Sequence, residues 1–302
     1  KEPYASFREL FNVYIVYAVS KCEVMDDSPT VFYSSLKEDS NGFYVSCDDY
    51  LVTEYASVVD ADLSETTILI IRNQQERIDL IDGMADVFVY PKSSKVSDYG
   101  SGGSRAFVNR YDRAETALYS RIVNHEFGHA FAKLGDEYGI FSGVIPNDQK
   151  NILIEEANKW GYWKNIDFTS DPEQVKWKKF LLDERYTDVD LGIFVGGQTY
   201  HDGVWHPSQN NIMTNDTSPD AQFDAPSREA IYYRIHKLAY GDDWQYDYET
   251  FVQQDLKNIQ PESKTSTQSV PYPARVNEKK PFFKMEKIRD NDGQEMIRMI
   301  MN

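Results

Sequence analysis

Residues 112–135 constrain the fold more than any other part of the chain, because they predict a long helix that is apolar on nearly every side. Asp112 followed by Glu115 has the spacing of a capping box, which begins a helix, and Gly135 is a natural residue to end one. Two faces of this helix carry mostly apolar side chains: Leu118, Ile122, His125, His129 and Ala132 on one, and Val123, Phe127, Ala130 and Leu134 on the other. A helix with so little polar surface is expected to lie buried between layers.

This helix contains the pentad His125-Glu126-Phe127-Gly128-His129, an HExxH pattern. Histidines four residues apart lie one turn apart on the same helix face, so both imidazoles can reach one tetrahedral zinc ion. Two histidines and a glutamate in a buried helix would be costly without a metal to satisfy them. The pattern predicts His125 and His129 as ligands of one Zn²⁺ per chain. The alternative is a pair of hydrogen-bonded core histidines.

Glu126 adjoins the first of these histidines and is expected to point toward the coordination position that a catalytic zinc site keeps for water. A carboxylate there can take a proton from the water and pass it to a leaving amine. We therefore predict Glu126 as the general base of a hydrolytic reaction.

A catalytic zinc site needs a third protein ligand. The helix is followed by Gly135-Asp136-Glu137, where the glycine lets the chain turn back toward the metal. We predict Asp136 as the third ligand, with a solvated turn residue as the alternative and Glu137 as its nearest competitor. More distant candidates follow, the last two with weaker claims: His206, Glu155, Glu156, His201 and His236.

A methionine stands in the segment Asn211-Ile212-Met213-Thr214, 84 residues after His129. A lone methionine usually fills space in a core. Here it lies between the zinc helix and a capped C-terminal helix, the place of the methionine-containing turn under the zinc histidines of metzincins. The sequence therefore resembles a metzincin with two departures. Ala132 replaces the glycine expected three residues after the second histidine, and Asp136 follows that histidine by seven residues instead of six.

The run HEFGHAFAKLGDEY resembles the signature of the immunoglobulin A-specific metalloendopeptidase family. Further segments similar to that family extend the likeness from about residue 5 to 240: FNVYIVYAVS, YGSGGSRA, VKWKKF and GIFVGGQTYHDGVWHPSQNNIM. The resemblance implies a secreted or cell-surface bacterial zinc metallopeptidase. It also implies His125, His129 and Asp136 as ligands. Glu126 would be the base, and Met213 the methionine under the zinc histidines.

Two places are candidate substrate contacts. His206 stands where we expect an arginine in relatives, so its role is left open. The run of residues 99–103 is not a phosphate loop, because no Lys-Ser or Lys-Thr follows it. A strand at the edge of a cleft can pair with an extended peptide, and glycines let that peptide come close. Gly102 and Gly103 are therefore candidates, with a surface turn as an equal alternative.

The remaining patterns predict an α/β (α+β) fold, with a twisted, mostly parallel sheet beside the active-site helix and a mainly helical C-terminal subdomain. Strands are expected at residues 11–20, 30–33, 43–45, 66–72, 86–90 and 105–109, and further helices at 48–59, 171–186, 226–240 and 248–259. Residues 191–217 are expected to be irregular. The predicted divisions are 1–136, 137–260, and a linker with a hairpin tail over 261–302.

Composition excludes several classes of protein. Lys and Arg total 32 against 49 Asp and Glu, and the net charge of −17 disfavours nucleic-acid and anionic-lipid partners. The longest apolar runs, residues 11–19 and 67–71, are far shorter than the ~20 residues of a membrane span. We expect a protein or peptide substrate. The sequence does not indicate whether the chain forms oligomers. The start at Lys1 without an apolar leader indicates a processed or trimmed chain, and Cys22 and Cys47 form either a disulfide or two thiols.

Together these features predict a zinc-dependent metalloendopeptidase, with host glycoproteins such as immunoglobulins among its candidate substrates. Two other functions fit the same motifs. One is a protease fold kept as a non-catalytic binding module, and the other is a zinc amidase acting on cell-wall peptides. The intact ligand set together with Glu126 favours an enzyme over a binding module.

Overall fold

A computed structural model of the chain describes residues 1–20, 30–39, 42–73, 83–90, 97–110, 116–187, 190–214, 218, 220–259, 283–289 and 295–301. The chain forms two compact units, Lys1–Ile259 and Gln260–Asn302. In the second unit, strands β9 (Phe283–Arg289) and β10 (Glu295–Met301) pair antiparallel, which confirms the predicted hairpin. The linker predicted at residues 261–269 lies outside the described residues, and a division of the first unit at residue 136 stays a prediction.

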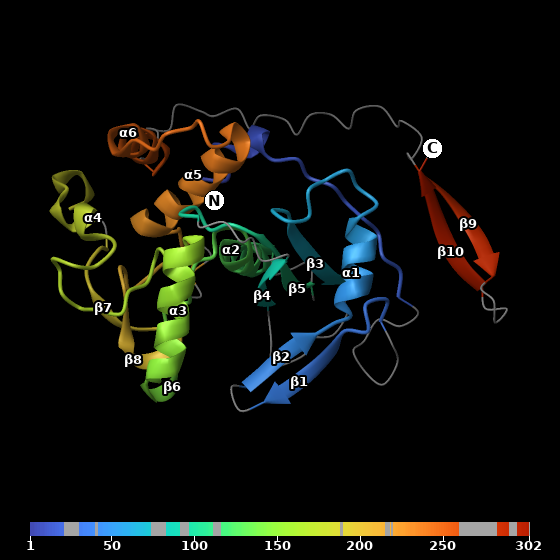
Figure 1. Cartoon of the computed structure of the whole chain (residues 1–302), viewed down its shortest axis with the longest axis horizontal. Coiled ribbons are helices and arrows are strands. Elements are labelled where there is room, and N and C mark those ends of the chain that lie inside the picture. Colours follow the sequence, from blue (N-terminus) through green and yellow to red (C-terminus); the bar gives the residue numbers. More distant parts are fainter. Residues whose placement is uncertain are drawn as a thin grey trace. The chain divides into compact units, whose positions relative to one another are not determined.

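The helix that carries the HExxH pentad is α2 (Thr116–Ala132). It packs against a three-stranded sheet and against helix α5 (Ala225–Tyr240), so the predicted burial between layers is confirmed (Figure 1). The sheet has the order β3 (Thr67–Asn73), β5 (Gly103–Arg110), β4 (Gly83–Tyr90). The capping box predicted at residues 112–115 lies outside the described residues.

Helix α2 ends earlier than predicted, at Ala132 rather than next to Gly135. The next residue, Lys133, has a φ of 54°, and its N–H donates to the His129 carbonyl. This left-handed conformation is usually occupied by glycine. Lys133 is fully buried, and its Nζ donates to the carbonyls of Gly102 and Ala130 at 2.9 and 2.6 Å. The tertiary hydrogen bond to Gly102 therefore helps to hold the lysine in this conformation, where the local sequence predicted more helix.

The predicted α+β class is confirmed, but the prediction of a mostly parallel sheet is wrong. Among the described strands, β3 pairs parallel with β5, and β6 (Gly139–Val144) pairs parallel with β8 (Thr199–His206). The other pairs are antiparallel: β4 with β5, β7 (Phe194–Gly197) with β8, β1 (Ser35–Asp39) with β2 (Gly42–Ser46), and β9 with β10. Short connections such as the single residue between β7 and β8 permit antiparallel neighbours only, since a parallel pair needs a long crossover.

The predicted strand at residues 11–20 is also wrong. This segment has no regular secondary structure, and Val13, Ile15 and Val19 are 81%, 74% and 71% exposed. Its residue types favour a strand, but a strand is stable only when it pairs with a neighbour, and no described strand pairs with it. Residues 30–33 likewise precede the first strand instead of forming it, whereas the strand predicted at 43–45 is confirmed by β2.

Most predicted helices are confirmed. Helix α1 (Asp49–Ala56) is capped at its N-terminus by Asp48, whose carboxylate accepts from the Leu51 N–H. Helix α6 (Tyr248–Ile259) matches its predicted bounds, and α5 ends at Gly241 with a φ of 75°. The helix predicted over residues 171–186 is much shorter, because only α4 (Lys178–Leu182) and a 3-10 turn (Glu184–Tyr186) form there.

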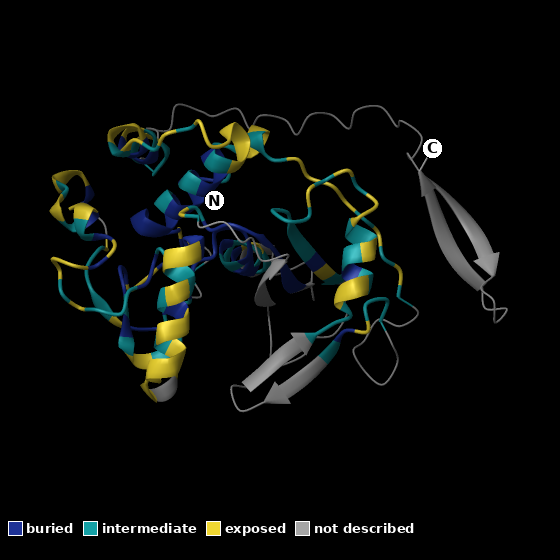
Figure 2. Cartoon of the chain, in the orientation of Figure 1, coloured by how far each residue is buried: buried dark blue, intermediate teal, exposed yellow. Residues whose placement is uncertain are grey.

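The part of the first unit after residue 136 contains four of the described α-helices, as the prediction of a mainly helical subdomain expects, and also an unpredicted three-stranded sheet of order β6-β8-β7. Two of its strands lie in the segment 191–217 that was expected to be irregular. Helix α3 (Asn147–Trp160) packs beside this sheet through Leu153 and Trp160 and exposes its opposite face, whereas α5 is buried along much of its length (Figure 2). No helix among the described residues is long and apolar enough to cross a bilayer.

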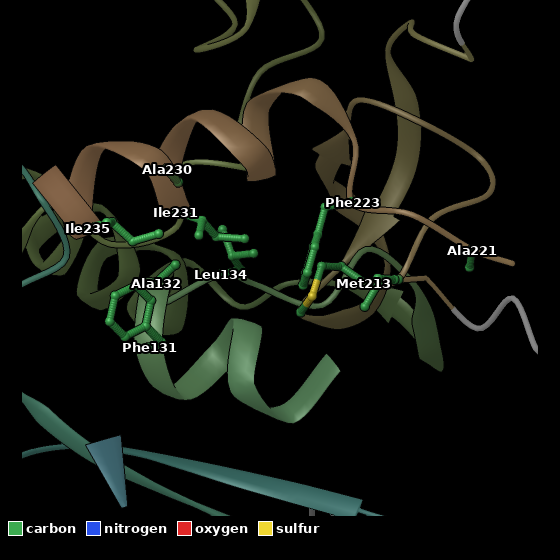
Figure 3. Close-up of a cluster of buried hydrophobic side chains, with 10 residues drawn as sticks. Phe131, Ala132, Leu134, Met213, Ala221, Phe223, Ala230, Ile231 and Ile235 are labelled. Carbon is green, nitrogen blue, oxygen red and sulfur yellow. The ribbon is translucent and has the colours of Figure 1, made fainter. Parts of the chain in front are cut away.

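One cluster of buried apolar side chains fixes α2 against the C-terminal part of this unit (Figure 3). It draws from α2, from the segment after it, from the turn around Met213 and from α5. Its members include Phe131, Leu134, Met213, Phe223 and Ile231. A core of this density resists displacement, so it gives the HExxH helix a rigid support.

Candidate metal centre

His125, His129 and Asp136 bring three ligand atoms together at one point. The two histidine Nε2 atoms are 3.0 Å apart, and the Asp136 Oδ1 lies 3.3 Å from the Nε2 of His125 and 3.1 Å from that of His129. Zinc bonds of about 2.0–2.1 Å at tetrahedral angles place neighbouring ligand atoms about 3.3 Å apart. The three atoms therefore match one face of a zinc tetrahedron, and the fourth corner is left for water or substrate.

Backbone carbonyls orient both imidazoles. The Nδ1 of His125 hydrogen-bonds to the Ile212 carbonyl at 2.7 Å, and the Nδ1 of His129 to the Leu134 carbonyl at 2.6 Å. Since a carbonyl only accepts, each Nδ1 must carry the proton, and a neutral ring then presents a lone pair at Nε2. Two such lone pairs and a carboxylate oxygen converge on one point, an arrangement that calls for a cation.

The charges around His129 agree with this requirement. Burial disfavours its charged form, but the Asp136 carboxylate and the nearby Glu126 raise the pKa of His129 to about 9. In turn, the two imidazoles hold the pKa of Asp136 well below its usual range in spite of its burial. The site therefore binds a proton when no metal is present, and a bound metal would displace it.

The donor set fits zinc. Two imidazoles and one carboxylate are a known ligand set of catalytic zinc sites, which keep one further position open. Among the residues that the structure describes, this is the one group of three or more histidine, cysteine or acidic side chains close enough to hold a metal ion. The three side chains are 12%, 12% and 18% exposed, so the site is shielded but reachable.

Glu126 lies on α2 directly after His125, and it is only 6% exposed. Its charge is close enough to contribute to the raised pKa values of both His129 and Tyr138. A buried carboxylate therefore stands beside the three ligand atoms, as the predicted general base requires.

Tyr138 borders the same site. Its ring faces that of His125, with centroids 6.4 Å apart and planes inclined by 28°. Burial and the adjacent Asp136 carboxylate hold the pKa of Tyr138 well above its usual range, so the phenol stays protonated. Tyr138 stands in the motif HEFGHAFAKLGDEY, but no role in the site was predicted for it.

Met213 lies under α2, where the methionine turn was predicted. It is fully buried, and its Sδ would be 3.0 Å from a Cβ built on Gly128 (Figure 3 shows it with its neighbours). The Phe223 ring would come within 3.1 Å of the same position. Gly128 thus lets α2 rest directly on the methionine and the phenylalanine.

The competing ligands lie elsewhere. Glu137 is buried and points into a polar cluster, where its carboxylate accepts from Asn165 and Asn211 at 2.7 Å each. Burial raises the pKa of Glu137 to about 7, although these two amides work in the opposite direction. The remaining candidates fall outside the triad: Glu155 and His201 are exposed, Glu156 accepts from the Trp163 indole, and His236 bonds the Tyr232 carbonyl within an aromatic cluster.

His206 is buried at the end of β8, with its Nδ1 3.5 Å from the Glu137 carboxylate. It lines a cavity of about 380 Å³ that reaches Tyr138 beside the metal centre. The other lining residues are Glu137, Phe194, Val195, Gln209 and Thr214. This position is compatible with a substrate contact, and that role stays a prediction.

Gly102 and Gly103 do not form the predicted substrate-binding edge. Both are buried, and β5 is the middle strand of its sheet, so it has no open edge. The Gly102 N–H donates to Glu65, and its carbonyl accepts from Lys133 and Arg234. Their backbone groups are therefore used inside the protein. A disulfide and two thiols both stay predictions for Cys22 and Cys47, because Cys22 lies outside the described residues.

Sequence reasoning missed the groups that hold the metal-binding residues in place. Asn165 binds the backbone of Gly135 on both sides, since its Oδ1 accepts from the Gly135 N–H and its Nδ2 donates to the Gly135 carbonyl, both at 2.8 Å. The carbonyls of Leu134 and Ile212 carry no side-chain signal at all. Asn211 belongs to the segment Asn211-Ile212-Met213-Thr214 around the methionine, whereas no sequence pattern around Asn165 indicates a functional role.

Comparison with known proteins assigns no family: no protein-family model matches the chain, and no curated protein matches it.

Proposed function

We propose that this protein is a zinc-dependent metalloendopeptidase with a metzincin-like catalytic unit. The observation that supports the proposal is the convergence of His125 Nε2, His129 Nε2 and Asp136 Oδ1, with both Nδ1 atoms fixed by carbonyls. A single metal ion would accept a lone pair from each of these three atoms. The resemblance of HEFGHAFAKLGDEY to the immunoglobulin A-specific metalloendopeptidases agrees with this function and with a secreted or cell-surface enzyme.

The residues of the site divide the chemistry between them. A zinc ion held by the triad would supply a Lewis acid, which acidifies water and polarises the scissile carbonyl. Glu126 accepts the proton of the attacking water and delivers it to the amine as the peptide bond breaks. Its burial keeps the carboxylate close to the reacting atoms and away from bulk solvent.

The substrate is a protein or peptide in this proposal, with host glycoproteins such as immunoglobulins as the first class to test. The cavity beside Tyr138 and His206 offers space for one side chain of such a substrate. A zinc amidase acting on cell-wall peptides would use the same catalytic residues. Hydrolysis of a mixed set of host proteins, compared with hydrolysis of peptidoglycan fragments, separates these two substrates.

Glu126→Ala tests the proposal directly. The parent chain should bind about one zinc, as a three-ligand site requires, and should hydrolyse protein in a manner abolished by a chelator. The variant should keep its zinc, and its rate of protein hydrolysis should be about 10²–10⁴-fold lower, which is the usual contribution of a general base. Metal content by mass spectrometry and cleavage of a protein mixture supply the two measurements.

Retained turnover in Glu126→Ala would remove that residue from the mechanism. A parent chain that binds zinc without any hydrolysis would favour the binding module, and a parent that binds no zinc after loading would refute the metal centre.

A further inference from the structure

Glu137 is a buried carboxylate directly after the proposed ligand Asp136, yet it is not one of the three residues that converge at the metal centre. One carboxylate oxygen accepts from the Nδ2 of Asn165 and the other from the Nδ2 of Asn211, both at 2.7 Å. The Ser227 hydroxyl and the His206 ring lie farther off, each at 3.5 Å. Its side chain therefore bridges two amides that come from distant parts of the chain.

Each amide is in turn bonded to a backbone segment of the metal centre. Asn165 binds both backbone groups of Gly135, in the segment that ends α2 and presents Asp136. Asn211 accepts the Met213 N–H at 2.5 Å, in the turn that lies under α2. Glu137 adds a direct link between the two segments, because its own N–H donates to the Met213 carbonyl at 2.8 Å.

These two segments also carry the carbonyls that orient the histidines. Leu134 accepts from His129 in the first segment, and Ile212 accepts from His125 in the second. The distance between the segments therefore decides whether both Nε2 atoms point at the same place. Outer partners that orient a metal-binding histidine commonly change metal affinity by about 10–100-fold when they are removed.

We propose that Glu137 is a positioning residue of the metal centre, which fixes the spacing between residues 134–136 and 211–213 so that both histidines aim at one ion. This inference rests on the proposed zinc site. Each oxygen of the Glu137 side chain accepts from a different amide. A glutamine would present an NH₂ group to one of the two amide donors and lose that bond.

The test uses Glu137→Gln, which keeps the shape of the side chain. Asp255→Asn is the matched control, because Asp255 is also a buried carboxylate, and its partners Arg228 and Tyr186 lie outside segments 134–136 and 211–213. Zinc affinity is measured by competition with a chelator, and the ligand geometry by the visible absorption spectrum of the cobalt(II)-loaded protein. Glu137→Asp serves as a second variant, because it keeps the charge but is too short to reach both amides.

We expect Glu137→Gln to weaken zinc binding at least about tenfold and to change the cobalt spectrum. Asp255→Asn should leave both unchanged, even though it lowers the thermal stability. The positioning role would be overturned if the folded Glu137 variants bound zinc within about twofold of the parent affinity. It would also be overturned if Asp255→Asn weakened zinc binding equally. Failure of the parent chain to bind zinc would instead overturn the proposed function, so the two failures are distinct.

Discussion

Backbone carbonyls, rather than side chains, orient the two histidines of the metal centre. Because every residue type has the same carbonyl, changes of the side chains at positions 134 and 212 should matter less than changes that move the backbone there. The ligands are different in this respect, since each depends on its own side chain. At the scale of single residues, the site should therefore be sensitive to the ligands and to the groups that fix these two peptides.

Asp136→Asn replaces the third ligand by a neutral side chain of the same shape. Zinc affinity should fall by more than the about 10–100-fold typical for the loss of an outer partner, because a ligand and a charge are both removed. Glu155→Gln is the matched control, since this exposed glutamate was an alternative ligand in the sequence analysis and should not affect zinc. Chelator competition measures both variants. Equal affinities would mean that Asp136 is not a ligand.

Zinc binding should weaken as the pH falls. The metal-free site holds a proton, because the pKa of His129 is raised to about 9 mainly by the Asp136 charge acting against burial. Below that pH each zinc must displace about one proton, so the apparent affinity should drop about tenfold per pH unit. Calorimetry in two buffers of different ionisation enthalpy measures the proton release directly. A constant affinity between pH 7 and 8 would contradict the raised pKa.

At the scale of secondary structure, the elements that sequence predicted correctly are those with local signals. Helices α1, α5 and α6 have caps and a clear apolar period, and α2 also brings its histidines together through its own geometry. The end of α2 was mispredicted because the distant Gly102 carbonyl holds the Lys133 side chain. Strands β7 and β8 were missed because β7 is short and rich in glycine, and β8 takes its parallel partner, β6, from a distant part of the sequence. For the same reason the ligands were predictable and Asn165 was not.

Gly128→Ala tests how closely α2 rests on Met213. Alanine favours a helix by about 1 kcal/mol over glycine, but the added Cβ would lie 3.0 Å from the Met213 sulfur and 3.1 Å from the Phe223 ring. Overpacking of this kind costs about 1–3 kcal/mol, so we expect a net loss of stability and a lower zinc affinity.

Ser120→Ala is the control for this substitution, because Ser120 is an exposed residue of the same helix and its replacement should be nearly neutral. Thermal unfolding and chelator competition compare the two variants. An equally stable Gly128→Ala with parental zinc affinity would show that α2 does not rest on Met213 as described.

At the scale of the whole molecule, one apolar segment, residues 12–20, contributes no side chain to the core clusters of the described part of the chain. Residues 11–20 have strand-forming side chains, but they are largely exposed, and only Phe11 joins a core cluster. Periodicity and residue type could not reveal this, because burial depends on a pairing partner elsewhere in the chain. The structure therefore predicts that this segment contributes little to stability.

Ile15→Ala and Ile70→Ala make the same chemical change at 74% and 8% exposure. The first should alter the free energy of unfolding by no more than about 0.5 kcal/mol, whereas the second should cost about 2–5 kcal/mol. Denaturant unfolding measures both. A large loss in Ile15→Ala would show instead that residues 11–20 form the buried strand predicted from sequence.

All three ligands lie within residues 125–136, whereas the carbonyl that aims His125 belongs to Ile212. During synthesis the complete chelating segment therefore leaves the ribosome well before the part of the chain that orients it. Under the proposed function, a growing chain would present all three ligands before the later turn docks beneath the helix and orients His125. Metal capture and the onset of activity would then be separate events in the maturation of this protein.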